Sequence, residues 1–176
     1  RGVTGAVGHG SGALIGALLP LIDTPAAATD EASPQREAVL AALNGVLGDR
    51  LQALGNPLAQ TMELRSDGAP VTPAPDALTA QLPGAGPHLV LLIHGLCMND
   101  AQWRRSGHDH GAFLAQALGA TPIYLRYNSG LHISVSGRAL ALLLEQLVAA
   151  WPVPPARITI VGHSMGGLVA RSAVAV

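Results

Sequence analysis

The second half of the sequence alternates between apolar runs and segments whose apolar residues have helical spacing. The first run, His88 to Ile93, is continuously apolar after its histidine, which is typical of a strand buried on both faces. Thr121 to Tyr127 and Arg157 to Val161 predict two further strands. Strands and helices that take turns along a chain form a parallel sheet with helices on both faces. We therefore predict an α/β fold with a mostly parallel sheet.

A helix is predicted after each of these strands. Asp109 is a suitable cap for a helix over His110 to Leu118. Ser134 or Ser136 caps a longer helix, and prolines downstream end it. A third helix covers Leu168 to Val174. The apolar positions of the longer helix are Leu140, Leu143, Leu144, Leu147 and Val148.

Residues 1–58 have a different pattern and predict a helical extension in front of residues 59–176. Ser33 begins a helix that runs to about Leu47, with apolar residues at helical spacing. A second, short helix is predicted over Asp49 to Leu54, and Gly55 ends it. The two predicted domains are thus the extension and the α/β unit.

The beginning of the extension is uncharged. Gly2 to Ile22 contains no Asp, Glu, Lys or Arg, but it is rich in glycine. A spanning helix needs roughly 20 predominantly apolar residues. We interpret the stretch as a small-residue helix that packs on protein, and the alternative is contact with a membrane surface. Ala26 to Pro34 is predicted to be a linker.

A hairpin is predicted between the extension and the first buried strand. Met62 to Arg65 and Ala69 to Thr72 are its strands, and Ser66-Asp67-Gly68 is a turn signal between them. The proline-rich passage from Pro70 to Pro87 is then expected to cross to the next element without regular structure.

Composition limits the classes of function. Hydrophobic residues make up 49% of the 176 residues and charged residues 12%, which argues against a disordered chain. The net charge is −1 and there is no basic run, so no nucleic-acid partner is expected. Cys97 is the sole cysteine, which excludes an internal disulfide and favours a cytoplasmic location. We interpret Cys97 as a small buried residue.

The strongest candidate chemistry lies near the end of the sequence. Gly162-His163-Ser164-Met165-Gly166 fits G-x-S-x-G, the turn that exposes a nucleophilic serine between a strand and a helix. The pattern alone is weak because the chain has 21 glycines. A predicted strand before it and a predicted helix after it supply the required context. The alternative is a glycine-rich turn in which Ser164 caps the helix.

A second signal follows the first buried strand. In such a fold, an oxyanion donor comes from the loop after that strand, where His94-Gly95-Leu96 lies. Gly95 lets the backbone turn, and the N–H of Leu96 would join that of Met165 around the developing negative oxygen. His163 is expected to point away from the site. Taken alone, His94-Gly95 could be an ordinary turn at the end of a strand.

These segments make the chain similar to the α/β-hydrolase superfamily, in its lipase and esterase branch. The matching pieces are LLIHGL (Leu91 to Leu96) and VGHSMGGLVAR (Val161 to Arg171). YLRYNSG and the helix after it also resemble bacterial lipase-like members, including some similar to inositol deacylases. The resemblance covers about Thr61 to Val176. It implies the N-terminal half of an α/β-hydrolase fold, with Ser164 as nucleophile and the Leu96 and Met165 amides as oxyanion donors.

The resemblance also implies that an acid and a histidine follow the serine along the chain. The twelve residues after Ser164 cannot hold another strand–helix unit, so we expect a fragment that lacks both partners and is itself inactive. Upstream candidates for a substitute base or acid are Asp100, His108, Asp109, His110 and His132.

Two ligand hypotheses are weak. His108-Asp109-His110 could ligate a metal, but no cluster of further ligands accompanies it, and no metal is expected. Gly8 to Ala13 fits G-x-G-x-x-A without a preceding strand, so no dinucleotide cofactor is expected. The predicted function is therefore hydrolysis of a small acyl ester or lipid ester, without a cofactor. The alternatives are acyl transfer and a non-catalytic hydrolase-like scaffold.

Overall fold

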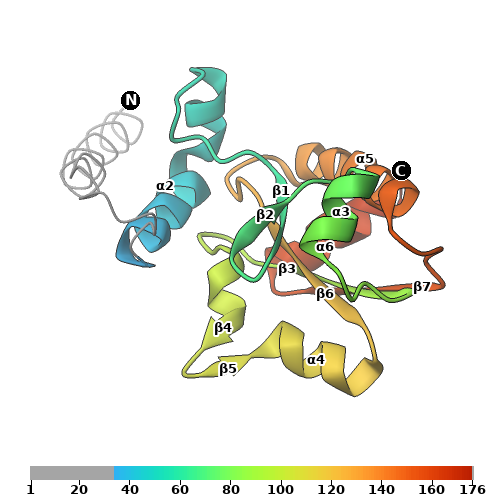
Figure 1. Ribbon diagram of the computed structural model, residues 1–176. Coiled ribbons are helices and arrows are strands. Elements are labelled where there is room, and N and C mark those ends of the chain that lie inside the picture. Colours follow the sequence, from blue (N-terminus) through green and yellow to red (C-terminus); the bar gives the residue numbers. More distant parts are fainter. Residues whose placement is uncertain (1–33, 176) are drawn as a thin grey trace, which may run out of the picture.

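The computed structural model describes residues 34–175, which contain one five-stranded sheet in the order β2-β1-β6-β3-β7 (Figure 1). Strand β1 is antiparallel to both of its neighbours, and β3 is parallel to β6 and to β7. Four of the strands therefore run in the same direction. The predicted mostly parallel sheet is confirmed. The strands are β1 (Glu63–Ser66), β2 (Ala69–Val71), β3 (His88–Ile93), β6 (Thr121–Arg126) and β7 (Arg157–Gly162).

Strand β3 is the centre of the sheet. Its Leu91 pairs with Ile123 on one side and Ile160 on the other. Leu91 lies with Leu89 and Ile93 in one hydrophobic cluster, whereas Val90 and Leu92 lie in a second cluster. All five side chains are buried, as predicted for a strand covered on both faces.

Helices cover both faces of the sheet. Helices α5 (Ile133–Ala150) and α6 (Met165–Ala173) pack against the first cluster, and α4 (His110–Leu118) contacts β3 and β6 at the other face (Figure 1). The cap of α4 is as predicted, because the Asp109 carboxylate accepts a hydrogen bond from the Ala112 N–H. The prediction that Ser134 or Ser136 caps α5 is wrong. The His132 carbonyl already accepts helical hydrogen bonds, so both serines lie inside the first turn.

Among the described residues, α5 is the one helix long and apolar enough to cross a membrane by length and composition. Its Leu140 and Leu147 are fully buried against the sheet. We therefore interpret α5 as a core helix of the α/β unit.

The passage before β3 contains a helix, contrary to the prediction of an irregular crossing. Helix α3 (Pro75–Gln81) has a proline in its first turn, where the missing N–H is not needed. Leu78 is fully buried and joins the main hydrophobic cluster. Between β3 and α4, the chain forms η1 (Asp100–Trp103) and a small hairpin of β4 (Arg104–Arg105) and β5 (His108–Asp109).

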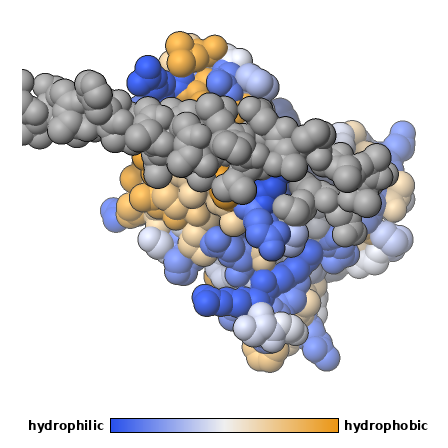
Figure 2. Space-filling model, turned by 90° about the vertical axis from the view of Figure 1, so that its left-hand side faces the viewer, coloured by the Kyte–Doolittle hydropathy of each residue, from blue (hydrophilic) through white to orange (hydrophobic). Residues whose placement is uncertain are grey.

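In the described part of the extension, residues 34–58, there is one helix, α2 (Pro34–Ala53), in place of the two helices predicted between Ser33 and Leu54. Gly48 does not end the first helix, because it packs tightly against the Asn128 side chain and a Cβ atom there would collide with that amide. The buried residues of α2 are mainly small or polar, and Val46 remains exposed. On the face shown in Figure 2, hydrophobic residues gather in the upper half, and hydrophilic ones lie mostly below. Predictions for Gly2 to Ile22, Gly8 to Ala13 and residues 26–33 lie outside the described residues.

Candidate active site

The carboxyl ends of β3 and β7 bring Gly95 and Ser164 together. Ser164 is exposed in the sharp turn between β7 and α6, with φ 52° and ψ −120°. Positive φ is rare for a residue with a side chain and costs free energy. Ser164 occupies the N-cap position of α6, but its hydroxyl makes no capping hydrogen bond. The Ser164 side chain therefore does not act as a helix cap.

Close packing explains the glycines around Ser164. A Cβ at Gly166 would collide with the carbonyl oxygens of Ile93 and His94. A Cβ at Gly162 would lie 2.5 Å from the Gly167 nitrogen. The glycine before the serine thus allows the turn itself, whereas the one after it lets α6 begin directly against the end of β3.

The backbone amides of the two loops differ in their hydrogen bonds. The N–H groups of Cys97, His163 and Gly166 each donate to an acceptor within the chain. Within residues 34–175, the N–H groups of Leu96 and Met165 have no such acceptor. Among the described residues, both amides thus lack the acceptor that their neighbours have, as donors to a ligand oxygen would.

His94 is a buried, neutral residue at the end of β3. Its Nε2 accepts a hydrogen bond from the Tyr127 N–H at 3.3 Å, and its Nδ1–H donates to the Gly95 carbonyl at 2.9 Å. This pairing requires the tautomer with the proton on Nδ1. Burial lowers the pKa of His94 to about 4, so the ring is uncharged at neutral pH. His94 therefore supports the loop and is not a base for Ser164.

The other titratable candidates are also engaged elsewhere. Both oxygens of Asp100 bind arginines, at 3.1 Å from the Arg65 Nε and 2.5 Å from the Arg126 Nε. Asp109 accepts hydrogen bonds from Tyr124, Ala112 and Arg104; these lower the pKa of its carboxyl, although burial acts in the opposite direction. Neither carboxylate contacts Ser164.

The histidines near the site form an aromatic group with Trp103. The ring of His163 lies 6.4 Å from that of Trp103 and the ring of His110 lies 6.1 Å from it, both edge-on. His108 stacks edge-on against His110 at 4.6 Å. His132 lies apart, at the start of α5. None of these rings makes a hydrogen bond to Ser164 within the described residues. Residues 34–175 also hold no group of three or more potential metal ligands.

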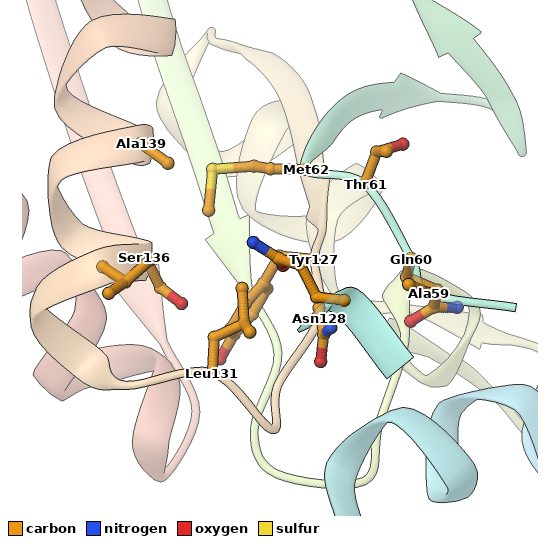
Figure 3. A pocket seen from close by; sticks show the side chains of 11 residues that line it. Ala59, Gln60, Thr61, Met62, Tyr127, Asn128, Leu131, Ser136 and Ala139 are labelled. Carbon is orange, nitrogen blue, oxygen red and sulfur yellow. The ribbon is translucent and has the colours of Figure 1, made fainter. Parts of the chain in front are cut away.

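A pocket of about 300 Å³ lies at the end of β6 (Figure 3). Met62 extends into it opposite Ala139 of α5, and Leu131 lies below them. Tyr127 also lines the pocket, and its ring stacks on His94 at 4.4 Å. The lining is mainly apolar, so the pocket suits a hydrophobic group.

Residues 84–176 match the model of a protein family described as "Putative serine esterase (DUF676)". The match spans just over half of the chain. The chain belongs to this serine esterase family. No curated protein and no solved structure matches the sequence significantly.

The match to the serine esterase family begins shortly before β3, and it covers β3, β6 and β7 with the segments that follow them. It includes Gly95, Tyr127 and Ser164. Helix α2 and the β1–β2 hairpin precede the matched residues. The predicted relationship to esterases is thus confirmed at the level of the family.

Sequence analysis missed two residues that shape this site. Tyr127 and Ser129 follow β6 directly and are 1% and 2% exposed. Both bind the loop that contains Gly95, as described below. The available signal was a run of polar residues, YNSG, at the carboxyl end of a buried strand, which is where α/β sheets place their functional groups.

Proposed function

We propose that this chain carries the nucleophile and oxyanion hole of a serine hydrolase that cleaves carboxylic esters, within the α/β-hydrolase superfamily. Ser164 is the nucleophile, and the N–H groups of Leu96 and Met165 stabilise the oxyanion. The observation that carries the proposal is the pair of unused amides beside a strained, exposed serine that makes no capping hydrogen bond. Membership of the serine esterase family supports it.

The proposed reaction has two stages. The Ser164 Oγ attacks the ester carbonyl, and the negative charge that develops on the carbonyl oxygen is held by the two amides. The ester bond breaks, the alcohol leaves, and water then cleaves the acyl-enzyme. A histidine outside residues 34–175 serves as base and then as acid. The same apparatus performs acyl transfer when another alcohol or a thiol replaces water.

The substrate class follows from the pocket at the end of β6. Its apolar lining and its volume of about 300 Å³ suit the hydrocarbon part of an acyl or lipid ester. The exposed side chain of Leu96 adds apolar surface next to Gly95. We propose that the acyl chain passes the loop after β3 and enters this pocket. No cofactor or metal has a role in this chemistry.

The decisive experiment treats the full-length protein with a fluorophosphonate, which labels nucleophilic serines. We expect one label per chain, lost in Ser164→Ala, together with loss of p-nitrophenyl butyrate hydrolysis. Circular dichroism checks that the variant is folded. Hydrolysis retained by Ser164→Ala excludes Ser164 as the nucleophile. Absence of both labelling and hydrolysis in the unmutated protein favours a non-catalytic scaffold.

A further inference from the structure

Three consecutive buried residues, Tyr127, Asn128 and Ser129, follow β6 directly. They lie within the segment YLRYNSG, and the proposed chemistry does not use them. Buried polar groups are costly unless their hydrogen bonds are satisfied. The partners of these side chains therefore indicate what the segment does.

Tyr127 holds the residue before Gly95. Its hydroxyl donates a hydrogen bond to the His94 carbonyl at 2.9 Å, and its backbone N–H donates to the His94 Nε2. Its ring stacks on the imidazole with an interplanar angle of 23°. Three contacts from one residue thus fix the position and the ring orientation of His94.

Ser129 holds the residue after Leu96. Its Oγ accepts a hydrogen bond from the Cys97 N–H at 3.0 Å. Cys97 has φ 58°, a conformation that a residue with a side chain adopts only when its surroundings hold it. The hydroxyl of Ser129 is one such restraint, and it acts on the peptide group that follows Leu96.

Helix α2 contacts both the segment after β6 and the loop after β3. The Asn128 amide donates a hydrogen bond to the Gly48 carbonyl at 2.9 Å, and its Oδ1 accepts one from the Gly130 N–H at 3.1 Å. Gly45 of α2 packs directly on the backbone of Cys97. The loop after β3 therefore lies between α2 and the segment after β6.

We propose that Tyr127 and Ser129 are positioning residues for the oxyanion hole. They bind His94 and Cys97 on either side of Gly95 and Leu96, and so set the direction of the Leu96 N–H. This inference rests on the proposed function of Ser164. Neither residue touches the substrate carbonyl in this role.

The test compares an oxygen ester with its thionoester, in which sulfur replaces the carbonyl oxygen. Sulfur is the weaker hydrogen-bond acceptor, so a well-placed oxyanion hole favours the oxygen ester. Tyr127→Phe keeps the ring and its stacking but loses the bond to the His94 carbonyl. With p-nitrophenyl substrates, we expect kcat/KM of the oxygen ester divided by kcat/KM of the thionoester to fall by about tenfold. This effect is smaller than the 10²–10³-fold loss in rate when a whole oxyanion donor is removed. Ser129→Ala removes the hydroxyl that binds the Cys97 N–H and should also lower this ratio.

Tyr124→Phe is the matched control. Tyr124 lies on β6 and is 3% exposed, but its hydroxyl binds Asp109 on the opposite face of the sheet. This variant should leave the ratio unchanged. If Tyr127→Phe and Ser129→Ala slow both substrates equally, or slow neither, the positioning role is wrong while the esterase function stands. If the unmutated protein shows no hydrolysis that depends on Ser164, both proposals fall.

Discussion

Gly95 and Ser164 lie in direct contact at the ends of two neighbouring parallel strands. A Cβ atom at Gly95 would lie 3.2 Å from the Cβ of Ser164 and 3.0 Å from the Nδ1 of His163. The loop after β3 thus approaches the serine as closely as its backbone allows. In the proposed oxyanion hole, this contact would bring the loop that carries the Leu96 amide next to the turn that carries the Met165 amide.

The first prediction follows from that contact. Gly95→Val inserts side-chain atoms where even a Cβ is tighter than usual, so the loop must move away from Ser164. We expect kcat/KM for an ester to fall by about 10²-fold, as when one oxyanion donor is lost. Gly84→Val is the matched control, because nothing lies within 4 Å of a Cβ there. Equal kcat/KM values for the two variants would refute the role of the loop.

The second prediction concerns the strain at Ser164. With φ 52°, both serine and alanine are disfavoured at this position, whereas glycine is not. Ser164→Gly should therefore be more stable than Ser164→Ala by about 1 kcal/mol in urea denaturation, although both lack the hydroxyl. Equal stability of the two variants would show that the turn is not strained.

The five strands of the main sheet and α4 were predictable because their signals are local. A continuous apolar run predicted β3, and segments rich in apolar residues predicted β6 and β7. The Asp67-Gly68 turn, with positive φ at both residues, predicted the β1–β2 hairpin. The errors arose where tertiary contacts decide. Glycine weakens the interior of a helix, but Gly48 packs on Asn128 and α2 continues through it.

The site was predictable to the same extent. The serine and the glycine loop have short motifs, and each follows an apolar strand, so their meeting follows from parallel pairing. The partners of Tyr127 and Ser129 are 33 and 32 residues away in the sequence. No local pattern identifies such partners. Asp100 was a candidate acid by its position alone, and only the structure shows that two arginines occupy it.

The third prediction is a pH dependence of stability caused by His94. Its pKa is about 4 in the folded protein and near the ordinary 6.5 in the unfolded chain. Between these values the unfolded chain binds a proton that the folded protein does not. The contribution of neutral His94 to the free energy of unfolding is therefore fully present above pH 6.5. It is lost as the pH falls towards 4, and the loss amounts to about 3 kcal/mol in total.

The measurement for His94 is urea denaturation of the protein and of His94→Asn at several values between pH 4 and 7. The variant will be less stable throughout, so the slopes are compared and not the absolute values. We expect the free energy of unfolding to depend less on pH in the variant. Parallel slopes would show that His94 does not titrate on unfolding in this range.

The fourth prediction concerns Asp100, which is 6% exposed and joins β1 to β6 through Arg65 and Arg126. Arg126 continues to Glu37 of α2 at 2.6 Å, so the network ties the extension to the sheet. Asp100→Ala leaves two largely buried guanidinium groups without this partner and should cost about 3–5 kcal/mol of stability. Asp67→Ala removes an ion pair between the fully exposed Asp67 and the partly exposed Arg104, and it should lower the stability far less. Similar losses in thermal unfolding would contradict the structural role of Asp100.

The last prediction tests the pocket as the acyl site. Ala139 lines the pocket on α5, opposite Met62, so Ala139→Trp fills the space that an acyl chain would occupy. Hydrolysis of a long-chain p-nitrophenyl ester should fall by at least about tenfold, while that of the acetate stays the same. Ala149→Trp places the same side chain at an exposed position of α5 away from the pocket and should change neither rate. Loss of both activities in Ala139→Trp would indicate damage to the fold, which circular dichroism detects. If a folded Ala139→Trp variant hydrolyses the long-chain ester and the acetate in the same ratio as the unmutated protein, the acyl chain binds elsewhere. The assignment of Ser164 is not affected by that result.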